Sequence, residues 1–205
     1  MSRQDARLGA PGMALLLPLL LGAAACTATP SATVPFVQMS EPPASAPDSS
    51  ADASFGAVVI DPTLVAVFPA TVGGLPVAES PDGEADAAAN DVLPTIASAA
   101  AAIVAVDQST SDLVYALIVR VRPGALTDAT FRDWRDSYDE GVCTDPSAVV
   151  GHAEAQIGGR TVYIGTCADG LRTYHTWIEG KGLLISAAST GARKLGELLM
   201  GTLRP

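Results

Sequence analysis

The sequence is poor in the residue types that carry most enzyme chemistry and most nucleic-acid binding. Its 205 residues include two histidines and three cysteines, and 12 Lys and Arg residues stand against 22 Asp and Glu residues. The resulting formal charge of −10 makes nucleic acid and anionic lipid headgroups poor partners. We therefore expect no nucleic-acid partner.

The short motifs of common catalytic sites are missing as well. The sequence has no Gly-x-Ser-x-Gly elbow, no His-Glu-x-x-His, no Ser-x-x-Lys and no glycine-rich phosphate loop before a helix. We expect no cofactor. A dispersed Ser/His/Asp set that uses His152 or His175 stays open, because such triads are defined in space and not along the chain. An enzyme is therefore the alternative interpretation.

The most specific feature that is present is the apolar run 13–25 near the N-terminus. Arg3 and Arg7 precede this run, which is the order of a secretory signal. The run is shorter than the about 20 residues of a spanning helix. It predicts a signal peptide over residues 1–25 that is removed on export.

Small residues stand directly before Cys26 and resemble the lipobox of bacterial lipoproteins. In that family the cysteine sulfur receives a diacylglyceryl group and becomes the mature N-terminus. The family pattern usually has Leu three residues before the cysteine, where this chain has Ala23. Ordinary signal-peptidase cleavage after residue 25 is therefore the alternative. The resemblance implies an exported lipoprotein. Fatty acyl chains such as palmitate on Cys26 would anchor it to the bacterial cell membrane.

The number of cysteines also favours acylation of Cys26. In an oxidising compartment we expect Cys143 and Cys167 to form a disulfide, which leaves Cys26 without a partner. Acylation removes the free thiol that would otherwise remain. The disulfide would contribute about 3 kcal/mol and tie the end of a predicted helix to the sheet.

The chain after the signal divides into a tether and a domain. Residues 26–54 are rich in Pro, Ser, Thr and Ala and contain no Lys or Arg. Such a segment cannot bury enough apolar surface to fold, so it predicts a disordered tether. Residues 55–205 have the length of a single globular domain.

Hydrophobic patterns and turn residues predict an α+β domain with a mainly antiparallel sheet. Residues 113–121 indicate a central strand, and residues 153–188 indicate a C-terminal β-meander with Gly-Gly, Asp-Gly and Gly-Lys-Gly turns. A short strand is expected over residues 75–79. We expect helices to pack on the sheet over residues 63–68, 84–103, 128–140 and 191–203.

The helix over residues 128–140 is the most clearly amphipathic. Phe131, Trp134 and Tyr138 follow one side of it at helical spacing. We expect this aromatic stripe to pack in the core. The opposite, charged side, which includes Asp139 in this interpretation, is expected to face solvent.

The turn at residues 169–170 decides which side chains of the meander share a face. A two-residue Asp-Gly turn would pair Ala168 with Leu171 and place Cys167 and His175 on opposite faces. This register disfavours a zinc site, whose four candidate ligands also have unusually long spacings: Cys143, His152, Cys167 and His175. We therefore prefer the disulfide and expect no metal.

The same register collects apolar and aromatic residues on one face. This set would form a binding patch if no helix covered it, and it consists of Ile164, Leu171, His175 and Trp177. Burial of the same face in the core is the alternative. The sequence thus favours a membrane-anchored, extracytoplasmic lipoprotein whose domain is a non-enzymatic binding, sensory or assembly module for a protein or a small molecule. A cell-envelope hydrolase with a dispersed triad is the alternative.

Overall fold

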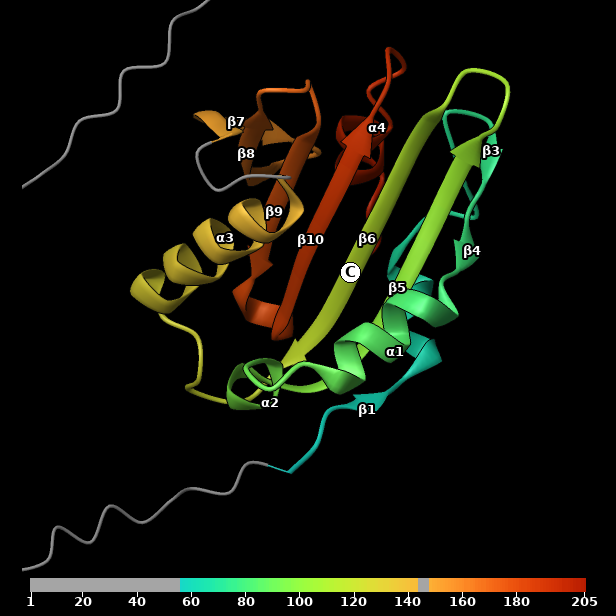
Figure 1. Cartoon of the computed structure of the whole chain (residues 1–205). Helices are drawn as coiled ribbons and strands as arrows, with labels where there is room; N and C mark the ends of the chain where they lie inside the picture. Colours follow the sequence, from blue (N-terminus) through green and yellow to red (C-terminus); the bar gives the residue numbers. More distant parts are fainter. Residues whose placement is uncertain (1–55, 144–147) are drawn as a thin grey trace, which may run out of the picture. The chain divides into compact units, whose positions relative to one another are not determined.

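The computed structural model describes residues 56–143 and 148–205. The predicted signal peptide, Cys26 and the tether lie outside the described residues. The described part is an α+β domain in which helices pack on a mixed, mostly antiparallel sheet (Figure 1). This architecture confirms the predicted fold class, including the C-terminal β-meander.

Eight strands of the described residues form the sheet, in the order β1-β5-β6-β10-β9-β8-β7, with β4 paired to β5 beside β1. Their bounds are β1 Val59–Ile60, β4 Ala78–Glu79, β5 Ala97–Asp107, β6 Asp112–Val121, β7 Val149–Ile157, β8 Arg160–Cys167, β9 Arg172–Ile178 and β10 Leu183–Thr190. A separate small hairpin consists of β2 (Thr71–Val72) and β3 (Leu75–Pro76). The four α-helices in this part of the chain are α1 (Pro81–Ala89), α2 (Leu93–Ile96), α3 (Asp128–Val142) and α4 (Leu195–Gly201), and short 3-10 helices span Pro62–Val67 and Glu179–Lys181.

The sheet carries a hydrophobic core on each face. One core includes Tyr174, Ile185 and Leu199 and lies between the sheet and α4. The other includes Leu184 and Phe131 and lies between the sheet and the helices α1, α2 and α3. The central strands are therefore buried on both sides.

Strand β5 corrects the prediction of a helix over residues 84–103. Only α1 and the single turn of α2 are helical, and the alanine-rich segment from Ala97 onward is a strand. The side chains of residues 100–102 are fully buried, in a strand that lies between β6 and the outer strands β1 and β4. Small side chains let layers on both faces approach closely, so packing outweighs the high helix propensity of alanine.

Helix α4 begins later than the predicted helix over residues 191–203. Gly191 and Lys194 have left-handed backbone conformations, with φ of 93° and 53°, and the helix starts at Leu195. Leu195 and Leu199 are buried, whereas Leu198 is 45 % exposed. The predicted strand 75–79 is likewise divided between β3 and β4.

The hairpin of β8 and β9 differs from the predicted register by one residue. Tyr163 pairs with His175, and Thr166 pairs with Arg172. A turn longer than two residues joins the strands, with a hydrogen bond from the Cys167 amide to the Leu171 carbonyl. Because a one-residue shift exchanges the faces of a strand, Cys167 and His175 lie on the same face. The prediction that they lie on opposite faces was wrong.

The predicted disulfide between Cys143 and Cys167 is present. Cys143 is the C-cap of α3, and Cys167 ends β8. At the other end of α3, the side chain of Thr127 caps the helix together with Thr130. Both ends of α3 are thus fixed, which positions the polar residues that the helix presents to the sheet.

Candidate functional site

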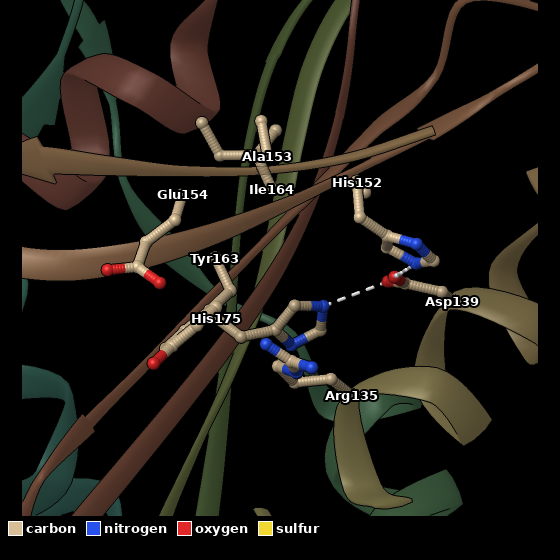
Figure 2. A pocket seen from close by; sticks show the side chains of 9 residues that line it. Arg135, Asp139, His152, Ala153, Glu154, Tyr163, Ile164 and His175 are labelled. Carbon is tan, nitrogen blue, oxygen red and sulfur yellow. Dashed lines mark hydrogen bonds and ion pairs between the residues drawn. The ribbon is translucent and has the colours of Figure 1, made fainter. Parts of the chain in front are cut away.

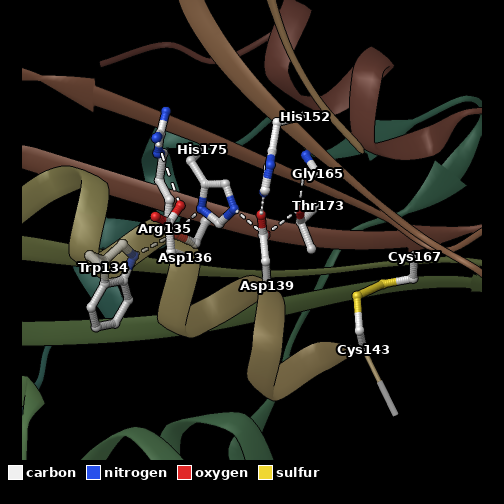
Figure 3. A network of polar contacts seen from close by, with 11 residues as sticks. Trp134, Arg135, Asp136, Asp139, Cys143, His152, Gly165, Cys167, Thr173 and His175 are labelled. Atoms are coloured by element: carbon white, nitrogen blue, oxygen red, sulfur yellow. Dashed lines mark hydrogen bonds and ion pairs between the residues drawn. A yellow bond between two sulfur atoms is a disulfide. The ribbon is translucent and has the colours of Figure 1, made fainter. Parts of the chain in front are cut away.

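Asp139 of α3 lies at the centre of a buried polar network (Figure 3). Its Oδ1 accepts a hydrogen bond of 2.5 Å from the Thr173 hydroxyl and lies 2.9 Å from Nε2 of His175. Its Oδ2 lies 3.2 Å from Nε2 of His152. The prediction that Asp139 faces solvent was wrong: the residue borders the aromatic stripe of α3 and is only 2 % exposed.

The network continues beyond His175 to a serine and a tryptophan. Nδ1 of His175 lies 2.9 Å from the Ser186 hydroxyl oxygen, which accepts a hydrogen bond of 2.9 Å from the Trp134 indole. The Ser186 hydroxyl can then donate to Nδ1, which leaves the Nε2 proton of His175 for the carboxylate of Asp139. We assign this tautomer from the hydrogen bonds on both sides of the ring.

Burial and hydrogen bonding set the charges at the centre of the network. Burial lowers the pKa of His175 below its ordinary value, although the hydrogen bond to Asp139 acts in the opposite direction. Burial alone would raise the pKa of Asp139, but hydrogen bonds from His175 and Thr173 outweigh it and hold this pKa below the usual range. The pair is therefore an ionised carboxylate and a neutral imidazole at neutral pH.

Gly165 of β8 makes room for the carboxylate. A Cβ atom at this position would overlap with Oδ2 of Asp139 and with the Thr173 hydroxyl. The amide of Gly165 also donates a hydrogen bond of 3.1 Å to the same hydroxyl. A glycine is thus part of the site, because the strand must approach α3 closely at this point.

A recess of about 250 Å³ opens beside the network (Figure 2). Asp139 and His175 are buried in its wall, while the His152 side chain is 57 % exposed. His152 and Glu154 come from β7, where they alternate with Ala153 and so share one face of the strand. The recess therefore combines a buried carboxylate with an accessible imidazole and a second carboxylate.

Arg135 of α3 adds a guanidinium group to the recess. Its Cζ lies 4.3 Å from the centre of the Tyr163 ring, a cation–π arrangement. Arg135 also forms an ion pair with Asp136, in which Nη2 lies 3.8 Å from Oδ1. The Nε atom is buried and has no hydrogen-bond partner among the described residues. Arg135 is therefore held in place with donor capacity left.

A second recess, of about 390 Å³, lies between α2 and α3. Trp134 and Tyr138 line it together with Val92, whose side chain is 65 % exposed. The Tyr138 hydroxyl is buried and has no hydrogen-bond partner in the described part of the chain. Burial raises the pKa of this hydroxyl far above its ordinary value, so it stays protonated.

The residues of the predicted binding patch do not form one surface. His175 is 1 % exposed beneath α3, and Trp177 on the same face is half-buried against Phe131, with ring centres 6.1 Å apart. Ile164 pairs with Tyr174 and packs against the core of the other face, although it also borders the first recess. Leu171 is half-buried in the turn. The structure thus places His175 and Trp177 on one face of β9, and Ile164 meets His175 only at the first recess.

Sequence reasoning missed Asp139, Arg135 and His152 as a group. The alternation of His152 and Glu154, at the start of the predicted meander over residues 153–188, was a usable signal for a shared face. A second signal was the place of Asp139 one helical turn before Cys143, which the disulfide holds against the sheet. No pattern along the chain connects these residues to Arg135.

The described residues set limits on other kinds of site. In residues 56–143 and 148–205, no group of three or more His, Cys, Asp and Glu side chains is arranged to hold a metal ion. None of the helices in these two ranges combines the length and apolar character needed to cross a membrane. Comparisons of the chain with models of protein families, with curated proteins and with solved structures find no match.

Proposed function

We propose that the protein is a tethered extracytoplasmic binding module whose first recess takes a small ligand with an acidic group. The disulfide supports a place in an oxidising compartment. The lipobox-like sequence before Cys26 and the Pro-rich segment after it support a lipid anchor and a tether. The ligand site itself is argued from the recess.

The observation that carries the proposal is the state of Arg135. Its guanidinium group lines the recess, and its ion pair with Asp136 is 3.8 Å long, so an anion in the recess would gain a closer, charge-assisted contact. His152 uses one ring nitrogen for Asp139 and keeps the other for a ligand. Carboxylates match the planar geometry of a guanidinium.

A negative charge on the rim of the recess, opposite in sign to Arg135, restricts the class of ligand further. Glu154 lines the same recess as Arg135 and offers an acceptor for a cationic group. A zwitterion with a carboxylate and an ammonium group would satisfy both residues. We therefore expect an amino-acid-like ligand to bind better than a simple acid or a simple amine.

Calorimetric titration of the exported protein with glycine, acetate and methylamine tests this proposal. Glycine should bind most tightly, and Arg135→Gln should abolish its binding. Arg132→Gln, an exposed position on the same helix, is the matched control and should bind glycine normally. Absence of binding by all three compounds, or undiminished binding by Arg135→Gln, would overturn the proposal.

A specific observation favours a hydrolase as the second candidate. Ser186, His175 and Asp139 are connected in the order of a nucleophile, a base and an acid, with both histidine contacts at 2.9 Å. Against this function, Ser186 is 1 % exposed, and its oxygen is occupied by the Trp134 indole. A fluorophosphonate probe discriminates the two functions: we expect no labelling, and labelling at Ser186 would favour the hydrolase.

A further inference from the structure

Among the described residues, strand β7 forms a long open edge of the sheet. It is the first strand of the meander along the chain and the outermost strand at this end of the sheet, where it pairs with β8 on one side (Figure 1). Residues 150–154 of the strand are all exposed. At the opposite end of the sheet, the outer strands β1 and β4 have two residues each. Short strands, prolines and lysines are common protections of sheet edges and are absent from β7, which has a bulge at its start and one carboxylate, Glu154.

We propose that β7 pairs with β7 of a second copy of this chain, in an antiparallel two-fold dimer centred on Ala153. In this register Ala153 lies opposite Ala153 of the partner subunit. His152 lies opposite Glu154 of the partner subunit, and Glu154 lies opposite His152 of the partner subunit. An imidazole and a carboxylate directly across two strands can share a hydrogen bond, and the two-fold axis makes this pair twice.

The neighbouring two-fold registers lack this complementarity. An axis at Glu154 would place two carboxylates directly opposite each other, which is destabilising. An axis at His152 would place two imidazoles opposite each other. An axis between two residues would pair each residue with its chain neighbour in the partner subunit. Neighbouring residues point to opposite faces of a strand, so this pairing is incompatible with a two-fold axis. The polar side chains of β7 therefore select the axis at Ala153.

The other face of β7 also suits close pairing. Gly151, Ala153 and Ala155 alternate with His152 and Glu154, so only small side chains meet on that face. A bulge at the start of β7 limits the regular part of the strand to residues 151–157. Such a pairing is smaller than the standard interface of about 1,600 Å². We therefore expect a weak dimer that high local concentration on a membrane would favour.

Pairing would also change the first recess. His152 and Glu154 face the same side as Tyr163 and Gly165, so both recesses open on one face of the joined sheet. Each recess then has Glu154 of the partner subunit beside its own His152. This consequence for the ligand rests on the proposed function, whereas the pairing itself does not.

Thiol cross-linking of the exported protein tests the register. Ala153→Cys places two thiols next to each other at the axis, where a short bis-maleimide can join them. Ala155→Cys is the matched control, because its two copies would lie about 14 Å apart along the strands. We expect Ala153→Cys alone to give dimers above the level of the unchanged protein. No increase for Ala153→Cys, or an equal increase for Ala155→Cys, would overturn the proposal.

Sedimentation velocity over a range of concentrations gives a second measurement. Glu154→Lys removes the carboxylate that lies opposite His152 of the partner subunit and should abolish the concentration-dependent dimer. Glu197→Lys, an exposed position on α4, should leave it unchanged. A protein that stays monomeric at all concentrations yet binds glycine would overturn the pairing and leave the proposed function intact.

Discussion

Oδ1 of Asp139 and Nε2 of His175 lie 2.9 Å apart, although 36 residues separate them in the sequence. This contact joins α3 to β9 in the interior of the domain. The disulfide at Cys143, one helical turn further along α3, holds the same end of the helix against β8. Together they fix the wall of the recess that Arg135 and His152 border.

Replacement of Asp139 by Asn should destabilise the domain. The amide nitrogen cannot accept a hydrogen bond, so at least one of His152, His175 and Thr173 would lose its acceptor. We expect the free energy of unfolding to fall by about 2–4 kcal/mol in urea titrations. Asp133→Asn, on the exposed side of α3, is the control and should change stability by less than about 0.5 kcal/mol. Equal effects of the two variants would contradict the central place of Asp139.

Stability should depend on pH through His175. Burial lowers its pKa below the ordinary value of 6.5, so the unfolded chain takes up this proton at a higher pH than the folded chain. The free energy of unfolding should therefore fall as the pH decreases below 6.5, by at most about 1.4 kcal/mol per pH unit for one proton. Loss of the Asp139 contribution follows at lower pH, below 3.8, because its folded pKa is also depressed.

The pH effect can be assigned by comparing two histidine variants. His175→Gln should reduce the slope of the unfolding free energy against pH between neutral pH and about pH 5. In this interval of about two pH units, His175 of the unfolded chain takes up its proton. His152→Gln, which alters the exposed histidine, is the control and should keep the contribution of His175. An unchanged slope in His175→Gln would show that another group is responsible.

A methyl group at Gly165 should disturb the network directly. Gly165→Ala places Cβ where the Asp139 carboxylate and the Thr173 hydroxyl now lie. We expect a loss of about 1–3 kcal/mol, measured by chemical denaturation. Gly180→Ala is the control, because a Cβ there has no neighbour within 4 Å. A stable Gly165→Ala variant with unchanged glycine binding would contradict the close packing at β8.

The disulfide should contribute a separate share of stability. It links residues 24 positions apart, and in the chain-entropy model its removal by Cys143→Ala and Cys167→Ala costs about 3 kcal/mol. Reduction of the disulfide in the unchanged protein should likewise lower the denaturant concentration at the midpoint of unfolding. Mass measurement after alkylation should show that both thiols become reactive only after reduction. Reactive Cys143 and Cys167 without reductant would contradict the bond in the exported protein.

The elements with strong local signals were predicted from the sequence. Strand β6 is a β-rich run, α3 has an aromatic stripe at helical spacing, and glycine-containing turns divide the meander. The Cys143–Cys167 pair followed from the expected export and the number of cysteines. Each of these signals depends on residues that are close together in the chain or, for the disulfide, on the odd number of cysteines.

The remaining features depend on contacts between distant parts of the chain. The alanines of β5 favour a helix by intrinsic propensity, and only the two packed faces of the sheet make them a strand. The register of β8 and β9 depends on turn length, which the Asp-Gly pair alone did not determine. Asp139 looks like a solvent-facing charge until His175 and Thr173 lie beside it.

The most direct test of the recess as a ligand site is nuclear magnetic resonance of the exported protein during titration with glycine. The side-chain Nε–H signal of Arg135 and the ring signals of His152 should shift together and saturate. Signals of Arg132 on the exposed side of α3 should not move. The absence of any shift at Arg135 and His152, or equal shifts at Arg132, would contradict ligand binding in this recess.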